Sequence, residues 1–268
     1  MQIYKEMSIG TAKPTTEEMQ GVPHYLIDFV NPEEEYNVSK YALEANQKIK
    51  EIIEKEKTPI IVGGTGLYID TLINGIEFKE IENDFEYRKE LEKELEKENG
   101  VDILFEKLKE IDPTSANKID KNNVRRVIRA LEIFKVTGKT KSQLDLESQK
   151  GSPYNFKVYG INWDRQKLYD RIDLRVDIMI KQGLIEEVRS LVDKYNLSKT
   201  AKQALGYKEV IEYFDGLISY EDMIEKIKRE SRRYAKRQLT WFRHIQSITW
   251  LDGEKPEEMV KIICRDND

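Results

Sequence analysis

Short apolar runs and amphipathic stretches alternate along the chain. The apolar runs predict four strands, at residues 24–30, 58–63, 157–163 and 247–251. Apolar positions at helical spacing predict two long helices, at residues 38–57 and 167–195. This order predicts an α/β fold in which helices cover a parallel sheet.

The strand pattern stops in the middle of the chain. Residues 86–99, 101–111 and 124–137 have helical spacing only, and the polar run 149–152 follows them. We therefore predict an α/β core formed by residues 1–82 and 152–268, interrupted by an all-helical insertion domain at 83–151.

Composition narrows the class of protein. The 268 residues are 39% hydrophobic and 35% charged, which is typical of a soluble globular protein, and no run has the ~18 apolar residues of a membrane span. A single cysteine, Cys264, excludes an intrachain disulfide and a multi-cysteine zinc site. We expect a cytoplasmic protein with no membrane partner.

The charge of the chain is unevenly distributed. The net charge is −5, yet residues 228–243 contain seven Lys or Arg and one acidic residue, while residues 80–110 contain twelve Asp or Glu and six Lys or Arg. The basic run predicts either a surface that meets phosphate groups or an ordinary solvated helix face.

Two glycine-containing segments are candidates for anion binding. The first lies between an apolar run and a helical pattern and consists of Gly63, Gly64, Thr65 and Gly66. It can bring backbone N–H groups and a hydroxyl to a phosphate, or it can simply connect two elements. The loop 9–14 offers glycine, a hydroxyl and a lysine, and a plain turn explains it equally well.

Arginines occur in pairs one helical turn apart. Arg125 and Arg129 can straddle adjacent phosphates or pair with acids of the insertion. Arg171 and Arg175 suit a diphosphate because guanidinium groups stay charged and offer forked donors, although aspartates nearby offer an ordinary ion-pair explanation.

The segment 236–243 mixes basic and aromatic residues. Lys236, Arg237 and Arg243 can attract phosphates, and Trp241 and Phe242 can stack on bases or pack in a core. By contrast, the tripeptide 138–140 resembles the end of a Walker A loop without its first glycine, and we predict a helix end capped by Gly138.

The order of these motifs resembles one family, the bacterial tRNA dimethylallyltransferases, over about residues 1–250. The motifs that carry the resemblance are Ile9-Gly10-Thr11-Ala12-Lys13-Pro14, Pro23-His24, Leu26-Ile27-Asp28, Gly63-Gly64-Thr65-Gly66-Leu67-Tyr68, Arg126-x-x-Arg129-Ala130-Leu131-Glu132, Gly206-Tyr207 and Lys236-Arg237-Gln238-x-Thr240-Trp241.

The resemblance implies an activity and a fold. The activity is transfer of a dimethylallyl group from dimethylallyl diphosphate to N6 of adenosine 37 in tRNA, with Mg²⁺ assisting, by a monomer. The fold is a P-loop NTPase-like parallel sheet with a helical insertion. In the family, the P-loop, the first strand and a catalytic aspartate precede the position of Met1, so we expect them to be absent here and the activity to be impaired.

The resemblance also implies roles for particular residues. Thr65, Arg175 and Arg171 are the expected catalytic residues, and Gly63, Gly64, Thr65 and Arg175 the expected diphosphate site. Contacts to tRNA are expected for Met1, Gln2, Ile3, Tyr4, Arg88, Arg125, Arg126, Arg129, Gln203, Gly206, Tyr207, Lys208, Lys236, Arg237, Gln238, Thr240, Trp241 and Arg243. The alternatives are a non-catalytic RNA-binding protein and a prenyltransferase acting on AMP.

Overall fold

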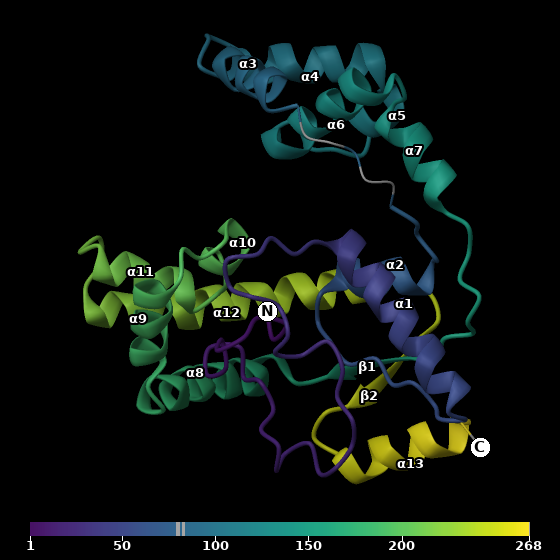
Figure 1. The fold of residues 1–268 in the computed structure, drawn as a ribbon, viewed down its shortest axis with the longest axis vertical. Coiled ribbons are helices and arrows are strands. Elements are labelled where there is room, and N and C mark those ends of the chain that lie inside the picture. Colours follow the sequence, from purple (N-terminus) through teal and green to yellow (C-terminus); the bar gives the residue numbers. More distant parts are fainter. Residues whose placement is uncertain (79–80, 82–83, 268) are drawn as a thin grey trace. The chain divides into compact units, whose positions relative to one another are not determined.

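The computed structural model describes residues 1–78, 81 and 84–267. These residues divide into two compact units, unit 1 formed by Met1–Ile69 and Asn155–Asp268 and unit 2 formed by Asp70–Tyr154 (Figure 1). The observed division falls inside helix α2 (Gly66–Ile73). The predicted boundary between residues 82 and 83 lies outside the described residues.

Unit 2 is helical. Its helices are α3 (Phe85–Leu95), α4 (Gly100–Ile111), α5 (Pro113–Ala116), α6 (Val124–Thr137) and α7 (Lys141–Ser148). The helices predicted at 86–99, 101–111 and 124–137 are confirmed as α3, α4 and α6. Their apolar stripes meet in one core around Leu91, Leu104, Leu108 and Leu131, as amphipathic helices require.

Helix α6 ends as predicted. Gly138 caps it with a left-handed backbone at φ 68°, and its N–H donates to the carbonyl of Phe134. The next helix begins with a capping box, in which Thr140 and Gln143 each satisfy the other's backbone N–H. The tripeptide 138–140 therefore separates two helices.

Unit 1 combines helices with a small sheet (Figure 1). Besides α2, its helices are α1 (Val38–Glu54), α8 (Arg165–Lys181), α9 (Leu184–Lys194), α10 (Lys199–Lys202), α11 (Tyr207–Phe214), α12 (Tyr220–Phe242) and α13 (Pro256–Asn267). Strands β1 (Val158–Asn162) and β2 (Ile248–Asp252) pair in parallel, with Val158 opposite Ile248. The strands predicted at 157–163 and 247–251 are therefore confirmed.

The strands predicted at 24–30 and 58–63 are wrong. The first contributes only an isolated bridge between Tyr4 and Val30, and the second is extended chain without a bridge. Ile60 and Val62 are 81% and 90% exposed. A strand needs a neighbour for its backbone groups, and no described strand lies beside residues 58–63. The sheet of the described residues has two strands.

The helix predicted at 167–195 is two helices. Gly183 has a left-handed backbone at φ 98°, which ends α8 and begins α9. The break lets α9 turn back so that Leu184, Val188 and Leu191 pack in the core with Val176 of α8. Helical spacing alone did not show this break.

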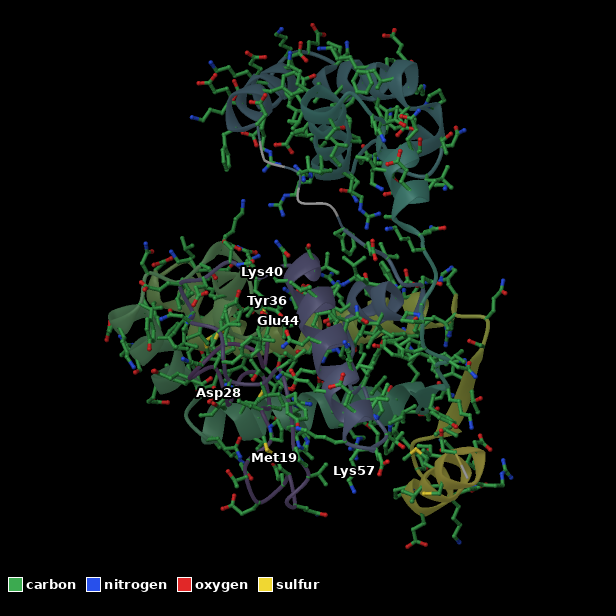
Figure 2. The ribbon with its side chains drawn as sticks, turned by 45° about the vertical axis from the view of Figure 1, so that its right-hand side comes forward. Met19, Asp28, Tyr36, Lys40, Glu44 and Lys57 are labelled. Carbon is green, nitrogen blue, oxygen red and sulfur yellow. The ribbon has the colours of Figure 1, made fainter. Side chains whose placement is uncertain are left out.

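Helix α1 is anchored at its start by polar contacts. Tyr36 donates from its hydroxyl to the Oε2 of Glu44 at 2.8 Å, and Lys40 donates to the carbonyl of Glu35 at 3.0 Å. Tyr36, Lys40 and Glu44 lie together at this end of the helix (Figure 2). In the same first turn, the ring of Tyr41 stacks on Tyr68 with 4.4 Å between centroids, which joins α1 to α2. No helix within the described ranges is long and apolar enough to cross a membrane.

Candidate active site

The glycine turn 63–66 leads directly into α2. The carbonyl of Thr65 accepts from the N–H groups of Tyr68 at 2.9 Å and Ile69 at 3.2 Å. The Thr65 side chain is exposed, and its hydroxyl has no hydrogen-bond partner among the described residues. The first N–H groups of a helix lack intrahelical partners and attract anions, so the turn can hold a phosphate group beside this hydroxyl.

Helix α12 packs closely on the glycine turn. The Nε2 of Gln238 donates to the carbonyl of Gly64 at 2.8 Å. A Cβ atom at Gly64 would lie 1.9 Å from that nitrogen, and a Cβ at Gly66 would lie 2.3 Å from the Cγ of Trp241. A side chain at Gly66 would have to displace the Trp241 ring, and one at Gly64 would push the Gln238 amide aside; these two glycines flank Thr65.

Arg175 of α8 has no acidic partner among the residues that the structure describes. The aspartates near it pair with α12 instead, Asp173 with Arg232 and Asp177 with Lys228 at 2.7 Å. The Arg175 side chain is exposed and has no ion pair with any residue that the structure describes. Neighbouring atoms nevertheless remove part of the hydration of its guanidinium group, and this desolvation lowers the pKa of the group, which still stays charged at neutral pH.

Arg171 lies one turn earlier on α8. Its guanidinium carbon is 4.3 Å from the centre of the Trp163 ring, an arrangement typical of a cation–π contact. The ion-pair explanation left open for Arg171 and Arg175 is therefore wrong for the aspartates at 173 and 177.

The segment that contains Met1, Gln2, Ile3 and Tyr4 is held by internal bonds. Gln2 donates to the carbonyls of Thr11 and Ala12, and the carbonyl of Ile3 accepts from two later N–H groups. Tyr4 is fully buried and donates to the carbonyl of Glu34 at 3.1 Å. Its side chain supports the segment from within, while Met1 is exposed.

A carboxylate of α9 holds the loop 8–10. Glu187 accepts from the N–H groups of Ser8 at 3.0 Å, Ile9 at 2.8 Å and Gly10 at 3.2 Å. It also accepts from the hydroxyl of Tyr207 at 2.5 Å. The anion-binding N–H groups of this loop are thus occupied by the protein's own carboxylate. Sequence reasoning missed Glu187, because nothing in its neighbourhood distinguishes it from other acids of an amphipathic helix.

The segment 203–208 forms the turn before α11. Gly206 has φ 90°, which favours glycine, and its N–H donates to Glu209 at 2.8 Å. Tyr207 is fully buried, and burial with the neighbouring carboxylate raises the pKa of its hydroxyl. Gln203 is exposed, and the Nζ of Lys208 lies 3.9 Å from the Oε1 of Glu212. Gln203 and Lys208 are the side chains of this turn that can reach an RNA.

The arginines of unit 2 behave in two ways. Arg88 and Arg129 both donate to the Oε2 of the fully buried Glu132, at 2.6 and 2.7 Å. Arg125 and Arg126 are exposed and make no ion pair within the described part of the chain. The salt-bridge alternative therefore holds for Arg129 and not for Arg125. Sequence reasoning recognised Glu132 only as part of a motif and did not predict its ion pairs. Its position three residues after Arg129 is the signal that could have predicted the pair with Arg129.

The exposed face of α12 is basic. Lys236 and Arg243 have no acidic partner among the described residues, and Arg237 lies over the ring of Tyr234 at 5.7 Å. Thr240 donates to the carbonyl of Lys236 at 2.9 Å. Trp241 is 38% exposed, so it is not a core residue, and most of its surface is covered by other residues and not available to stack on a base.

Comparison with known proteins places this arrangement in a family. Residues 2–245 match the IPP transferase family. A tRNA dimethylallyltransferase of Acetivibrio thermocellus is 51% identical over 265 residues, which cover 98% of this chain and 84% of that protein. One of Bacillus cereus is 48% identical over 266 residues, with the same coverage.

Solved structures agree with these matches. The full-length tRNA isopentenylpyrophosphate transferase of Bacillus halodurans superposes with a TM-score of 0.69 at 44% identity, covering 98% of this chain and 84% of that one. A eukaryotic dimethylallyltransferase described as acting on tRNA gives 0.73 at 30% identity, covering 94% and 65%. The chain belongs to the IPP transferase family. Its activity is the prenylation of tRNA, which confirms the function predicted from the motifs.

Proposed function

We propose that the chain transfers a dimethylallyl group from dimethylallyl diphosphate to the exocyclic N6 of adenosine 37 in tRNA. The bacterial relatives are tRNA dimethylallyltransferases and the eukaryotic enzyme is a dimethylallyltransferase acting on tRNA, which supports this pair of substrates. Within the chain, the observation that carries the proposal is the free guanidinium group of Arg175, whose neighbouring aspartates are engaged by α12.

The reaction needs positive charge at the leaving group. The bond between C1 of the dimethylallyl group and the diphosphate oxygen breaks and its electron pair stays with the diphosphate, N6 forms a bond to C1, and the proton that leaves N6 is taken up by the released diphosphate or by water. Charge develops on the diphosphate as this bond breaks, so fixed cations and N–H donors lower the barrier. We assign Arg175 to the diphosphate, with Arg171 supporting it, and Gly63, Gly64 and Thr65 to its binding at the start of α2.

The acceptor must reach this site from a folded RNA. A base inside a loop stack has to leave the stack before its exocyclic amine can react. We assign the tRNA backbone to exposed cations, Lys236, Arg237 and Arg243 on α12 and Arg125 and Arg126 in unit 2. Binding to phosphates through such side chains weakens steeply as salt rises.

Magnesium remains a prediction. The described residues contain no group of three His, Cys, Asp or Glu side chains that could hold a metal ion. Mg²⁺ in proteins commonly uses one or two carboxylates together with substrate phosphates and waters. A cluster of three protein ligands is therefore not required for Mg²⁺ to bind together with the diphosphate. The roles assigned to Arg175 and the glycine turn do not depend on the metal. A P-loop-like core and a monomeric state are proposed on the resemblance, and a cytoplasmic location is proposed on the composition and the single cysteine.

Label transfer tests the proposal. The chain is incubated with isotopically labelled dimethylallyl diphosphate and an unmodified tRNA, and the nucleosides are separated after digestion. We expect the label on adenosine, no label when position 37 is guanosine, and no product from AMP. Label absent from tRNA, or present on AMP alone, would contradict the proposal.

Arg175→Ala tests the assigned leaving-group contact. We expect kcat/KM for dimethylallyl diphosphate to fall about 100-fold, the scale for loss of one charge-stabilising group. Lys181→Ala is the matched control, because Lys181 is an exposed cation at the end of the same helix. Equal losses in both variants would remove the special role of Arg175.

A further inference from the structure

Gln238 and Trp241 lie one turn apart on α12 and both face the glycine turn. Gln238 donates to the carbonyl of Gly64 at 2.8 Å, and the ring of Trp241 occupies the space that a Cβ atom of Gly66 would need. Thr65 lies between these two glycines. The residue on each side of Thr65 is therefore held by the same helix.

Two cations without an acidic partner among the described residues, Lys236 and the C-cap residue Arg243, lie on the other side of α12. At about 100° per residue, Lys236 and Arg243 project away from the side that bears Gln238 and Trp241. Lys236 and Arg243 are exposed, whereas Gln238 is half-buried and uses an amide N–H for Gly64. One helix thus presents charge to solvent and a hydrogen-bond donor to the turn.

We propose that Gln238 is a positioning residue for the diphosphate site rather than a contact to tRNA, and that α12 links the two. This rests on the proposed function of the turn. Trp241 limits how the turn can shift at Gly66, and Gln238 sets the position of Gly64. Through them, the helix fixes the direction of the Thr65 hydroxyl and of the first N–H groups of α2.

The test uses Gln238→Glu in the full chain. Glutamate keeps the size of the side chain but places an acceptor where the Gly64 carbonyl needs a donor. We expect kcat/KM for dimethylallyl diphosphate to fall about ten-fold, which corresponds to about 1.4 kcal/mol. The Kd for tRNA should change less than two-fold.

Lys236→Gln is the matched control on the opposite face. We expect it to raise the Kd for tRNA and leave the KM for dimethylallyl diphosphate unchanged. If Gln238→Glu instead raises the Kd for tRNA and leaves the diphosphate kinetics intact, Gln238 contacts RNA and the proposal is wrong.

Hydrogen exchange supplies a readout that does not require turnover. The amides of Tyr68 and Ile69 bond to the Thr65 carbonyl, so they report on the order of the turn. We expect faster exchange there in Gln238→Glu and wild-type exchange in Lys236→Gln. Unchanged exchange of these amides in both variants would overturn the proposal. This result does not depend on label transfer, so it distinguishes failure of this proposal from failure of the proposed function.

A second variant approaches the contact from the turn. Gly64→Ala places a methyl group against the Gln238 amide and displaces it. We expect Gly64→Ala and Gln238→Ala to show similar losses for dimethylallyl diphosphate, and the double variant to be no worse than the worse single one. Additive losses would show that the two residues act separately.

Discussion

Unit 2 and the first part of unit 1 are held together by different kinds of contact. The helices of unit 2 follow one another closely and bury apolar stripes around a shared core. Residues 1–37 contain no helix, and their polar groups bond to groups far along the chain. The carboxylates of Glu33 and Glu35, for example, accept from the backbone N–H groups of Asn196 and Lys199. Local pattern therefore specifies unit 2, and distant polar contacts specify the start of unit 1.

Two carboxylates make this comparison concrete. Glu187 of unit 1 accepts from three neutral backbone N–H groups and one hydroxyl, whereas Glu132 of unit 2 accepts from two cations. The Oε1 of Glu132 and the Nε of Arg88 are buried and have no hydrogen-bond partner within the described part of the chain. Removing Glu132 would therefore leave charge unneutralised, while removing Glu187 would leave only dipoles unpaired.

The largest effect is expected from Glu132→Ala. It leaves Arg88 and Arg129 without their shared partner, and loss of one member of a buried ion pair costs about 3 kcal/mol or more. Urea unfolding measures this change. Glu106→Ala is the control, because it breaks an exposed pair with Lys109, which contributes little. Equal stability of both variants would show that local pattern alone holds unit 2.

Alkaline pH should weaken unit 1 next. Burial raises the pKa of Tyr41 to about 12. Because the folded state holds this proton more tightly than the unfolded state, the stabilisation is complete below about pH 10 and is lost as pH rises towards 12. From Tyr41 alone the loss is about 2 to 3 kcal/mol.

Urea unfolding at pH 9 and pH 12 checks this loss. Tyr41→Phe keeps the ring that stacks on Tyr68 and removes the ionisable group, so its stability should fall less between the two pH values. An identical fall in the variant would contradict the assignment to Tyr41.

The smallest effect is expected from Glu187→Gln. An amide keeps one acceptor oxygen but turns N–H donors towards the remaining N–H of the loop, which costs about 1 to 2 kcal/mol. Glu186→Gln is the control, since the neighbouring Glu186 is exposed. Hydrogen exchange of Ser8, Ile9 and Gly10 should speed up only in Glu187→Gln. A loss as large as that of Glu132→Ala would remove the distinction between dipoles and charges.

The sequence by itself determined helices α3, α4 and α6 of unit 2, the strands β1 and β2 and the cap at Gly138, whereas the short helices α5 and α7 were not predicted. Each depends on neighbours within one turn or on a strong apolar run. The family was also determined at this level, because its motifs are short and ordered along the chain. The residues of the glycine turn and the basic face of α12 were found in the same way.

Only the tertiary structure decided how the polar groups are partnered. Asp173 and Asp177 pair with α12 and not with Arg175. The loop 8–10 binds Glu187 instead of an external anion, and Gln238 faces Gly64. Each outcome depends on which distant groups come within hydrogen-bond distance. The segment 58–63 shows the same limit, because an apolar run becomes a strand only where a neighbouring strand supplies partners for its backbone. Periodicity records which side of an element is apolar, and it does not record which element packs against that side.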